Sequence, residues 1–327
     1  MVNSILLKKM ETNFSHILQN PSAKIYSSET KEIIEIEDRP LVMCPLCARL
    51  FFTDLEEDTI HLSNEHTPPH KLGGDINSIT CRTCNNMLGG KVDSELIRQV
   101  KLAAVLSGES PDLNYKTRLE RETLCATIGE TGESIWLNLS RQQDTWYMLY
   151  PEKEQTWGGK FFEGFMKGDK FQLKFTFSSH AIGVSLLKIA YLTAFAHFGY
   201  GFLFNRNINV NLMMMYQFSH PEEKVFSLKH WIDDNIPDEY LGVNILVNPI
   251  ELRAFVVVVD LVMGKHKQRH AVVLPGFRKN WRKTFNELTC GVEFSMFKCP
   301  DIDFLQSTYA AADMWDEMFD GDSDVNK

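Results

Sequence analysis

The sequence contains few cysteines and no long run of apolar residues. Seven of its 327 residues are cysteine, and Cys125, Cys290 and Cys299 stand apart from the others. This scattering excludes the disulfide framework of a small secreted protein and favours a reducing, cytoplasmic environment. No uninterrupted apolar run reaches the roughly 18 residues of a membrane span, and the first residues lack the apolar core of a signal peptide. We therefore expect a cytoplasmic protein without a membrane partner.

Net positive charge is also lacking, since the formal charge is −9 at pH 7. This excludes a protein that binds nucleic acid through its overall charge. A nuclease remains compatible with it, because phosphate contacts are local and need only a cluster of basic side chains. Much of the acidity lies within 306–327, which we predict to be an acidic tail.

The composition is that of a globular protein, with 44% hydrophobic and 24% charged residues. At about 150 residues per domain, the length predicts two domains. No internal repeat or low-complexity linker divides the chain. Changes along the sequence predict a helix (5–18) and connector within 1–39, a first module at 40–105 and a second domain at 115–305.

Four cysteines form two Cys-x-x-Cys pairs, Cys44 with Cys47 and Cys81 with Cys84. Two such pairs can converge on one tetrahedral zinc ion, each turning its backbone around the metal. Four sulfur ligands leave no open coordination position, so this zinc is predicted to be structural. The alternative is four reduced or disulfide-bonded cysteines in an ordinary core.

The residues held by these pairs suit a phosphodiesterase with one catalytic metal. Glu65 offers a carboxylate and Asn85 a carbonyl oxygen, which are ligands for Mg²⁺ or Mn²⁺. A histidine such as His66 suits a general base near neutral pH. Neighbours in an extended strand point to opposite faces, so Glu65 can hold the metal while His66 faces the attacking water.

The motif residues, in chain order, are Glu65-His66, Pro68, Gly73-Gly74, Asn77 and Cys81-x-x-Cys84-Asn85. In this order they resemble the HNH endonuclease (ββα-metal) superfamily in its zinc-ribbon form. The resemblance implies that His66 is the general base and that Asn77 hydrogen-bonds the loop that orients it. It also implies that Glu65 and Asn85 bind the catalytic Mg²⁺ or Mn²⁺. The departures from the family pattern are the Glu at 65, the short spacing from Asn77 to Cys81, and Gly89 where some relatives have a metal-binding His.

The remaining chain alternates between predicted helices and strands. Residues 91–108 have helical periodicity and are predicted to be the helix of the ββα unit or to pack behind it. Residues 178–204 are apolar nearly all round, but Lys188 and other polar residues interrupt them, so we predict a buried helix. The other predictions are strands within 123–140, 145–151, 170–178, 252–263 and 269–276, and a short helix within 220–235.

Basic residues gather at two neighbouring places in the second domain. The first is the predicted hairpin tip at 264–268, and the second is 277–283, where basic and aromatic residues alternate. Such surfaces contact phosphates and stack bases, although an ordinary solvated surface is the alternative. The predicted nucleic-acid contacts are Lys91, Lys265, Lys267, Arg269, Arg278, Lys279, Trp281, Arg282 and Lys283.

The sequence thus predicts an α+β protein. A ββα-metal HNH nuclease module with structural zinc is followed by a mixed β-rich accessory domain that contains a buried helix. The expected activity is metal-dependent hydrolysis of phosphodiester bonds, with DNA as the favoured substrate. One alternative is a non-catalytic zinc-ribbon adaptor for nucleic acid or protein. Another is the nuclease subunit of an antiviral defence or mobile-element assembly, with its protein partner on the accessory domain or the acidic tail.

Overall fold

The computed structural model has an α+β fold, as the sequence predicts. Its described residues form two compact units. The first includes those within Met1–Ile97, His180–Val262 and Lys267–Lys327, and the second those within Arg98–Ser179 and Met263–His266. The described residues are 2–19, 39–106, 125–131, 134–140, 171–204, 208–225, 228–248, 254–274 and 295–299, so most of the predicted connector and all of the predicted tail lie outside them.

The predicted ββα unit is present in the first compact unit. Strand β3 (Leu62–Thr67) pairs antiparallel with β4 (Asp75–Cys81), and α3 (Arg82–Leu88) follows directly. The helical path continues through a π-helical turn, η2 (Gly89–Asp93), into α4 (Ser94–Leu106). The hairpin that contains the candidate catalytic residues is therefore followed directly by a helix. The short elements around it are β1 (Leu41–Met43), β2 (Leu50–Phe52), α2 (Glu56–Thr59) and the 3-10 helix η1 (His70–Leu72).

The N-terminal helix α1 (Ser4–Leu18) agrees with the helix predicted at 5–18. It begins where the Asn3 side chain accepts a hydrogen bond from the Leu6 amide, which satisfies one of the free N–H groups of the first turn. Its buried Phe14 ring lies 4.7 Å from the ring of Tyr200, centroid to centroid. The start of the chain is thereby packed onto a segment far along the sequence.

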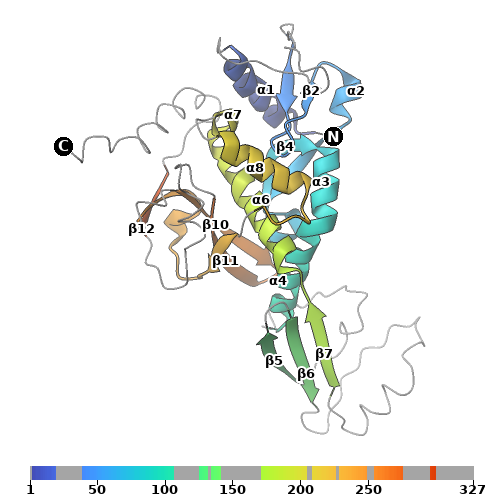
Figure 1. The fold of residues 1–327 in the computed structure, drawn as a ribbon, viewed down its shortest axis with the longest axis vertical. Coiled ribbons are helices and arrows are strands. Elements are labelled where there is room, and N and C mark those ends of the chain that lie inside the picture. The colour runs from blue at the N-terminus through green and yellow to red at the C-terminus, as the bar shows by residue number, and fades with distance from the viewer. Residues whose placement is uncertain are drawn as a thin grey trace, which may run out of the picture. The chain divides into compact units, whose positions relative to one another are not determined.

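A long buried helix, α6 (Ser179–Phe198), forms the centre of the first unit. Figure 1 shows it between the ββα segment and a five-stranded sheet. Its length and composition would allow it to cross a membrane, but 83% of the apolar window is buried inside the structure, as in a core helix. It ends at Gly199, where φ is +65° and a Cβ would meet the Asn13 amide oxygen at 2.5 Å. Glycine therefore lets the chain turn into α7 (Tyr200–Leu203).

The sheet of the first unit has the strand order β12-β9-β10-β11-β8, in which β9 pairs antiparallel with β10 and β12, and β8 pairs antiparallel with β11. The predicted strands at 252–263 and 269–276 are confirmed as β10 and β11. The helix predicted within 220–235 is wrong, because these residues contain β8, whose Ile232 pairs with His270. The strands are β8 (Lys229–Ile232), β9 (Gly242–Asn248), β10 (Ala254–Met263), β11 (His266–Val273) and β12 (Ser295–Lys298), with α8 (Ile208–Ser219) and the 3-10 helix η3 (Asp238–Tyr240) outside the sheet.

The second unit contains a three-stranded antiparallel sheet in the order β5-β6-β7. The hairpin predicted within 123–140 and the strand predicted within 170–178 are both confirmed. The strand predicted at 145–151 lies outside the described residues. The bounds are β5 (Cys125–Thr131), β6 (Ser134–Ser140) and β7 (Phe171–Thr176).

Candidate functional site

The two cysteine pairs come together in one cluster. Cys44 follows β1 and Cys47 precedes β2, while Cys81 ends β4 and Cys84 lies in α3. Their four Sγ atoms lie within 4.8 Å of one another. Because the cluster is held by two hairpins and a helix, a metal bound there would join all of these elements.

The geometry of the cluster fits a tetrahedral metal ion. A Zn–S bond of about 2.3 Å implies about 3.8 Å between the sulfurs of a tetrahedron, and the Cys47 and Cys81 sulfurs lie 3.7 Å apart. Two backbone amides donate to sulfur, from Cys81 to Cys44 Sγ at 3.3 Å and from Cys84 to Cys81 Sγ at 3.4 Å. Burial raises the pKa of the Cys44 thiol well above its ordinary value, and a cation bound at the cluster would act in the opposite direction. The four residues can hold a structural metal, and four sulfur donors favour zinc.

The β3–β4 hairpin carries a bulge at the candidate catalytic residues. Glu65 lies opposite Ser78, but His66 lies opposite Ile76, so Asn77 is an extra residue in β4. Bulges re-aim side chains and are frequent beside active sites. The Asn77 amide nitrogen donates to the Thr67 carbonyl at 3.4 Å, one residue beyond His66. Asn77 thus contacts the backbone beside the candidate base, and its role in catalysis stays a prediction.

His66 is half-buried on β3 and faces a second histidine. The ring centroids of His66 and His70 lie 5.1 Å apart, with the rings almost perpendicular. His70 is exposed at the start of η1 and was not predicted to belong to the site. Its signal in the sequence is only its closeness to His66.

The loop after His66 is closed by the two glycines of the motif. A Cβ on Gly74 would lie 1.6 Å from the Pro68 carbonyl oxygen, so no side chain fits there. Gly73 has a φ of +83°, in the left-handed region that glycine tolerates. The peptide between Thr67 and Pro68 is cis. These contacts explain why the motif has glycines at this point of the hairpin.

Asn85 connects α3 with β3. Its amide nitrogen donates to the Ser63 hydroxyl at 2.5 Å and to the Asn64 carbonyl at 3.1 Å. Because the nitrogen is committed to these two bonds, the amide oxygen is the atom that can serve as a metal ligand. That role remains a prediction.

The carboxylate of Glu65 is not open to a metal ion, as that of the predicted ligand would be. Its carboxylate is buried, with 4% of its surface exposed. Oε1 accepts a hydrogen bond from Lys188 Nζ at 2.9 Å, and Oε2 accepts one from the Thr80 hydroxyl at 3.3 Å. Both oxygens are therefore engaged inside the protein, and Glu65 and Asn85 as arranged do not fit a shared site for a catalytic divalent cation.

Arg269 is a buried structural residue, which contradicts its predicted contact with nucleic acid. Only 3% of its surface is exposed. Its guanidinium binds Asp260 through two hydrogen bonds of 2.7 and 2.9 Å and donates to Asp238 at 2.5 Å. It also donates to the Ile236 carbonyl. The donors of Arg269 are committed to these partners, so they hold the sheet and its neighbouring loop together.

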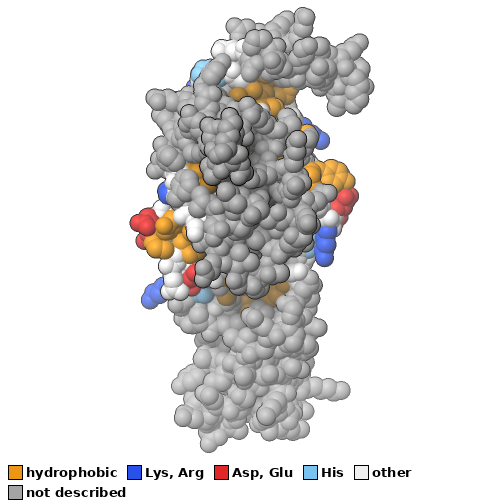
Figure 2. Space-filling model, turned by 60° about the vertical axis from the view of Figure 1, so that its left-hand side comes forward, with side chains coloured by type: hydrophobic (Ala, Val, Ile, Leu, Met, Phe, Trp, Pro, Cys, Tyr) orange, Lys and Arg blue, Asp and Glu red, His pale blue; other side chains and the backbone are white. Residues whose placement is uncertain are grey.

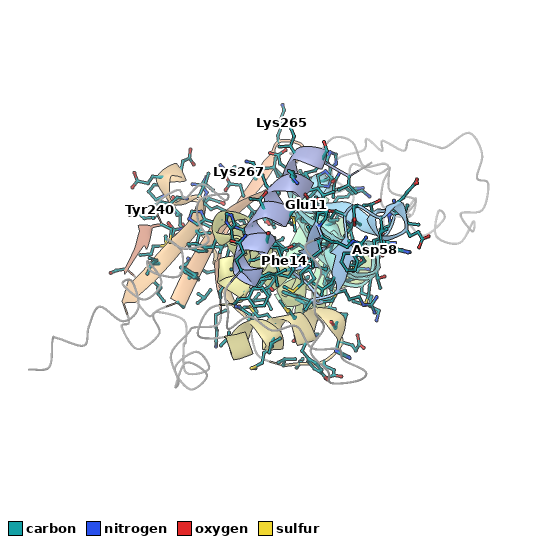
Figure 3. All side chains as sticks on the ribbon, turned by 90° about the horizontal axis from the view of Figure 1, so that it is seen from above. Glu11, Phe14, Asp58, Tyr240, Lys265 and Lys267 are labelled. Atoms are coloured by element: carbon teal, nitrogen blue, oxygen red, sulfur yellow. The ribbon has the colours of Figure 1, made fainter. Side chains whose placement is uncertain are left out.

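The other predicted nucleic-acid contacts that the structure describes are exposed lysines. Lys91 pairs with Glu222 at 3.4 Å and Lys267 with Asp260 at 2.8 Å. Lys265 lies in the turn between β10 and β11 and projects outward (Figure 3). The turn proper is Gly264 and Lys265, so Lys267 belongs to β11 and not to the tip.

The described basic side chains do not form one continuous patch on the face shown in Figure 2, where Lys and Arg appear singly beside acidic and apolar side chains. The predicted contacts that lie outside the described residues are Arg278, Lys279, Trp281, Arg282 and Lys283.

Comparison with known proteins agrees with this architecture. Residues 44–101 match the model of the HNH endonuclease family, from the first cysteine of the cluster into α4. No curated protein and no solved structure matches the chain. The match covers this segment alone. It confirms the resemblance carried by the sequence motifs and suggests a nuclease-type function with nucleic acid as the binding partner.

Proposed function

We propose that this protein is an endonuclease that hydrolyses phosphodiester bonds, with DNA as the favoured substrate. The observation that supports it best is the bulged β3–β4 hairpin, which exposes His66 in part and connects Asn77 to the backbone beside it. This hairpin runs directly into α3 and lies within the family match. The cysteine cluster joins the turn between β1 and β2 to the junction of β4 and α3.

In the proposed reaction, His66 accepts a proton from water at a ring nitrogen. The resulting hydroxide oxygen attacks phosphorus, the P–O bond to the leaving oxygen breaks, and the leaving oxygen takes a proton from solvent. Asn77 supports the base through the Thr67 carbonyl, which limits the movement of the strand that carries His66. A positioned base contributes about 10²- to 10⁴-fold to such a reaction.

A catalytic Mg²⁺ or Mn²⁺ is part of what the family implies, but its predicted ligand Glu65 is engaged elsewhere. The proposed reaction therefore uses only residues of the protein itself. The Cys44, Cys47, Cys81 and Cys84 cluster would hold zinc in a structural role, because four sulfur ligands leave no position for water or substrate.

A plasmid-nicking assay tests the proposal. Purified protein is incubated with supercoiled DNA, single-stranded DNA or RNA in Mg²⁺, in Mn²⁺ and without either ion. His66→Ala is expected to lower cleavage at least about 100-fold. The matched control is His61→Ala, an exposed histidine at the start of the same hairpin, which should keep the wild-type rate. Equal cleavage by the wild type and His66→Ala would exclude His66 as the base.

The buried ion pair of Glu65 favours a second candidate, a non-catalytic zinc-ribbon adaptor. In that case the wild type binds nucleic acid or a protein partner but cleaves none of the substrates in any of the metal conditions. His66→Ala then changes no measurement. A role as subunit of a defence or mobile-element assembly is compatible with either candidate, and cytoplasmic location is part of the proposal.

A further inference from the structure

Lys188 joins the central helix to the catalytic hairpin. It lies in the middle of α6 and is 1% exposed. Its Nζ is 2.9 Å from Glu65 Oε1 and 2.5 Å from Asp93 Oδ2. One ammonium group thus lies between two carboxylates that come from β3 and from the π-helical turn η2.

The remaining oxygens of the two carboxylates are also satisfied. Asp93 Oδ1 accepts a hydrogen bond from the Ser185 hydroxyl at 2.6 Å, and Glu65 Oε2 accepts one from Thr80 at 3.3 Å. Ser185 and Lys188 are three residues apart on one face of α6. Because every carboxylate oxygen has a donor, the position of Glu65 is fixed by contacts on both sides.

The charge balance makes this network sensitive to each of its members. Removing one partner of a buried ion pair leaves an uncompensated charge in the interior. Burial lowers the pKa of Lys188, but attraction to Asp93 and Glu65 outweighs it, so the pKa lies above its ordinary value. The lysine is therefore charged at neutral pH, as a fixed cation would be.

We infer that Lys188 is a positioning residue of the HNH module, whose ammonium group takes the place of a metal cation at Glu65 and so holds the strand that carries His66. This inference rests on the proposed function and deepens it. Glu65 directly precedes His66 at the bulge, so a displacement of the backbone at Glu65 would move the residue that carries the His66 ring. Glu65 is then an anchor and not a ligand of a catalytic metal.

Loss of the lysine has a specific consequence for metal binding. In Lys188→Met, the carboxylates of Glu65 and Asp93 face the same space without their ammonium group. Two carboxylates in one pocket attract a divalent cation through hard oxygen ligands. The variant should therefore acquire a stabilising Mn²⁺ site that the wild type does not have at this place.

The first measurement is thermal unfolding of zinc-loaded protein in metal-free buffer and across a Mn²⁺ titration. Lys188→Met is expected to have a lower Tm than the wild type without Mn²⁺ and to regain part of it as Mn²⁺ is added. The regain should disappear in Lys188→Met/Glu65→Gln. Lys91→Met, which removes an exposed ion pair, is the matched control and should match the wild type throughout.

The second measurement is Mn²⁺ affinity of Glu65→Gln, which keeps the size of the side chain. The inference expects a change of less than about twofold, whereas loss of a metal ligand weakens binding about tenfold or more. A tenfold loss in Glu65→Gln, or a Lys188→Met protein whose unfolding equals that of the wild type with and without Mn²⁺, would overturn the inference. If Lys188→Met does not fold, the Mn²⁺ affinity of Glu65→Gln alone tests the inference.

The third measurement separates this inference from the proposed function. In a cleavage assay, Lys188→Met should lower kcat about tenfold or more with little change in KM, because the base is misplaced while the substrate surface is intact. Absence of cleavage by the wild type would count against the proposed function. The Mn²⁺ measurements would still decide whether Lys188 takes the place of a metal at Glu65.

Discussion

The Tyr200 phenol binds both backbone groups of Met43, donating to its carbonyl at 2.6 Å and accepting from its amide at 3.0 Å. Burial raises the pKa of Tyr200 well above its ordinary value, so the phenol stays protonated and able to donate. Met43 directly precedes Cys44. In the preceding helix, α6, the Tyr191 hydroxyl donates a hydrogen bond to the Pro45 carbonyl at 2.7 Å. The turn that carries the first cysteine pair is therefore held by α6 and α7.

Replacement of Cys84 by serine is expected to release the structural metal and lower the unfolding temperature. The binding energy of a structural metal is part of the folding energy, so both properties should change together. Elemental analysis and calorimetry measure them. Cys299→Ser is the control, because Cys299 is buried outside the cluster and its loss should leave the metal content unchanged. Stoichiometric metal and an unchanged unfolding curve in Cys84→Ser would refute the four-cysteine site.

Replacement of Gly74 by alanine should destabilise the protein by at least about 3 kcal/mol. The added Cβ would overlap the Pro68 carbonyl oxygen, and the hairpin backbone would have to move. Gly89→Ala is the matched control. Gly89 has helical angles, and a Cβ there would meet no atom outside its own stretch of helix within 4 Å, so this change should stabilise the protein by about 0.5–1 kcal/mol. Chemical denaturation measures both, and equal stability of the two variants would contradict the described loop.

Replacement of Arg269 by methionine should lower the free energy of unfolding by about 3 kcal/mol. The change leaves Asp260 and the Ile236 carbonyl without the guanidinium that binds them. Lys267→Met removes another partner of Asp260, but Lys267 is exposed, so its loss should amount to less than about 1 kcal/mol. Urea denaturation compares the two. Nucleic-acid affinity that falls in Arg269→Met at unchanged stability would restore the predicted phosphate contact.

The buried imidazole of His270 predicts a loss of stability in acid. Its exposed fraction is 2%, and burial, followed by repulsion from His230, lowers its pKa to about 4. An unfolded histidine titrates near 6.5. Below that pH the unfolded state binds the proton first, so the contribution of His270 is fully present above about pH 6.5 and is lost as the pH falls towards 4. The loss amounts to at most about 3 kcal/mol.

The measurement for His270 is the free energy of unfolding between pH 7.5 and 4. His270→Gln cannot titrate in this range, so its stability should depend on pH less steeply than that of the wild type. His230→Gln is a second comparison, because it removes the repelling neighbour, so the pKa of His270 in the folded protein should rise and less stability should be lost in acid than in the wild type. Identical slopes in the wild type and His270→Gln would show that another group causes the acid sensitivity.

The cysteine cluster and the hairpin motif could be predicted because their signals are short and local. Two Cys-x-x-Cys pairs and the Glu65-His66 dipeptide can be found in a single reading of the chain, and the family match covers the same segment. The role of Lys188 could not be found this way. In the sequence it is only a polar residue in an apolar helix, and its partners lie 95 and 123 positions away.

Strand β8 and helix α8 show the same limit in the fold. Residues 220–235 contain no clear alternation, and a helix was predicted there, yet β8 is set by its register with β11, whose Val273 pairs with Lys229. Such pairing is decided by a partner distant in sequence. Residues 208–219 form helix α8, although no local pattern in the sequence predicts a helix there. In contrast, β10 has a long β-branched run that predicts a buried strand without its partners.

The late position of Lys188 in the chain also sets the order in which the protein is completed during synthesis. A ribosome adds about 5 to 20 residues per second, so Lys188 is made roughly 5 to 20 seconds after Asp93. Until then, the nascent module carries the Glu65 and Asp93 carboxylates without the ammonium group that they enclose in the folded protein. In the nascent chain, the Lys188 contact that fixes Glu65 can therefore form only after α6 has been translated.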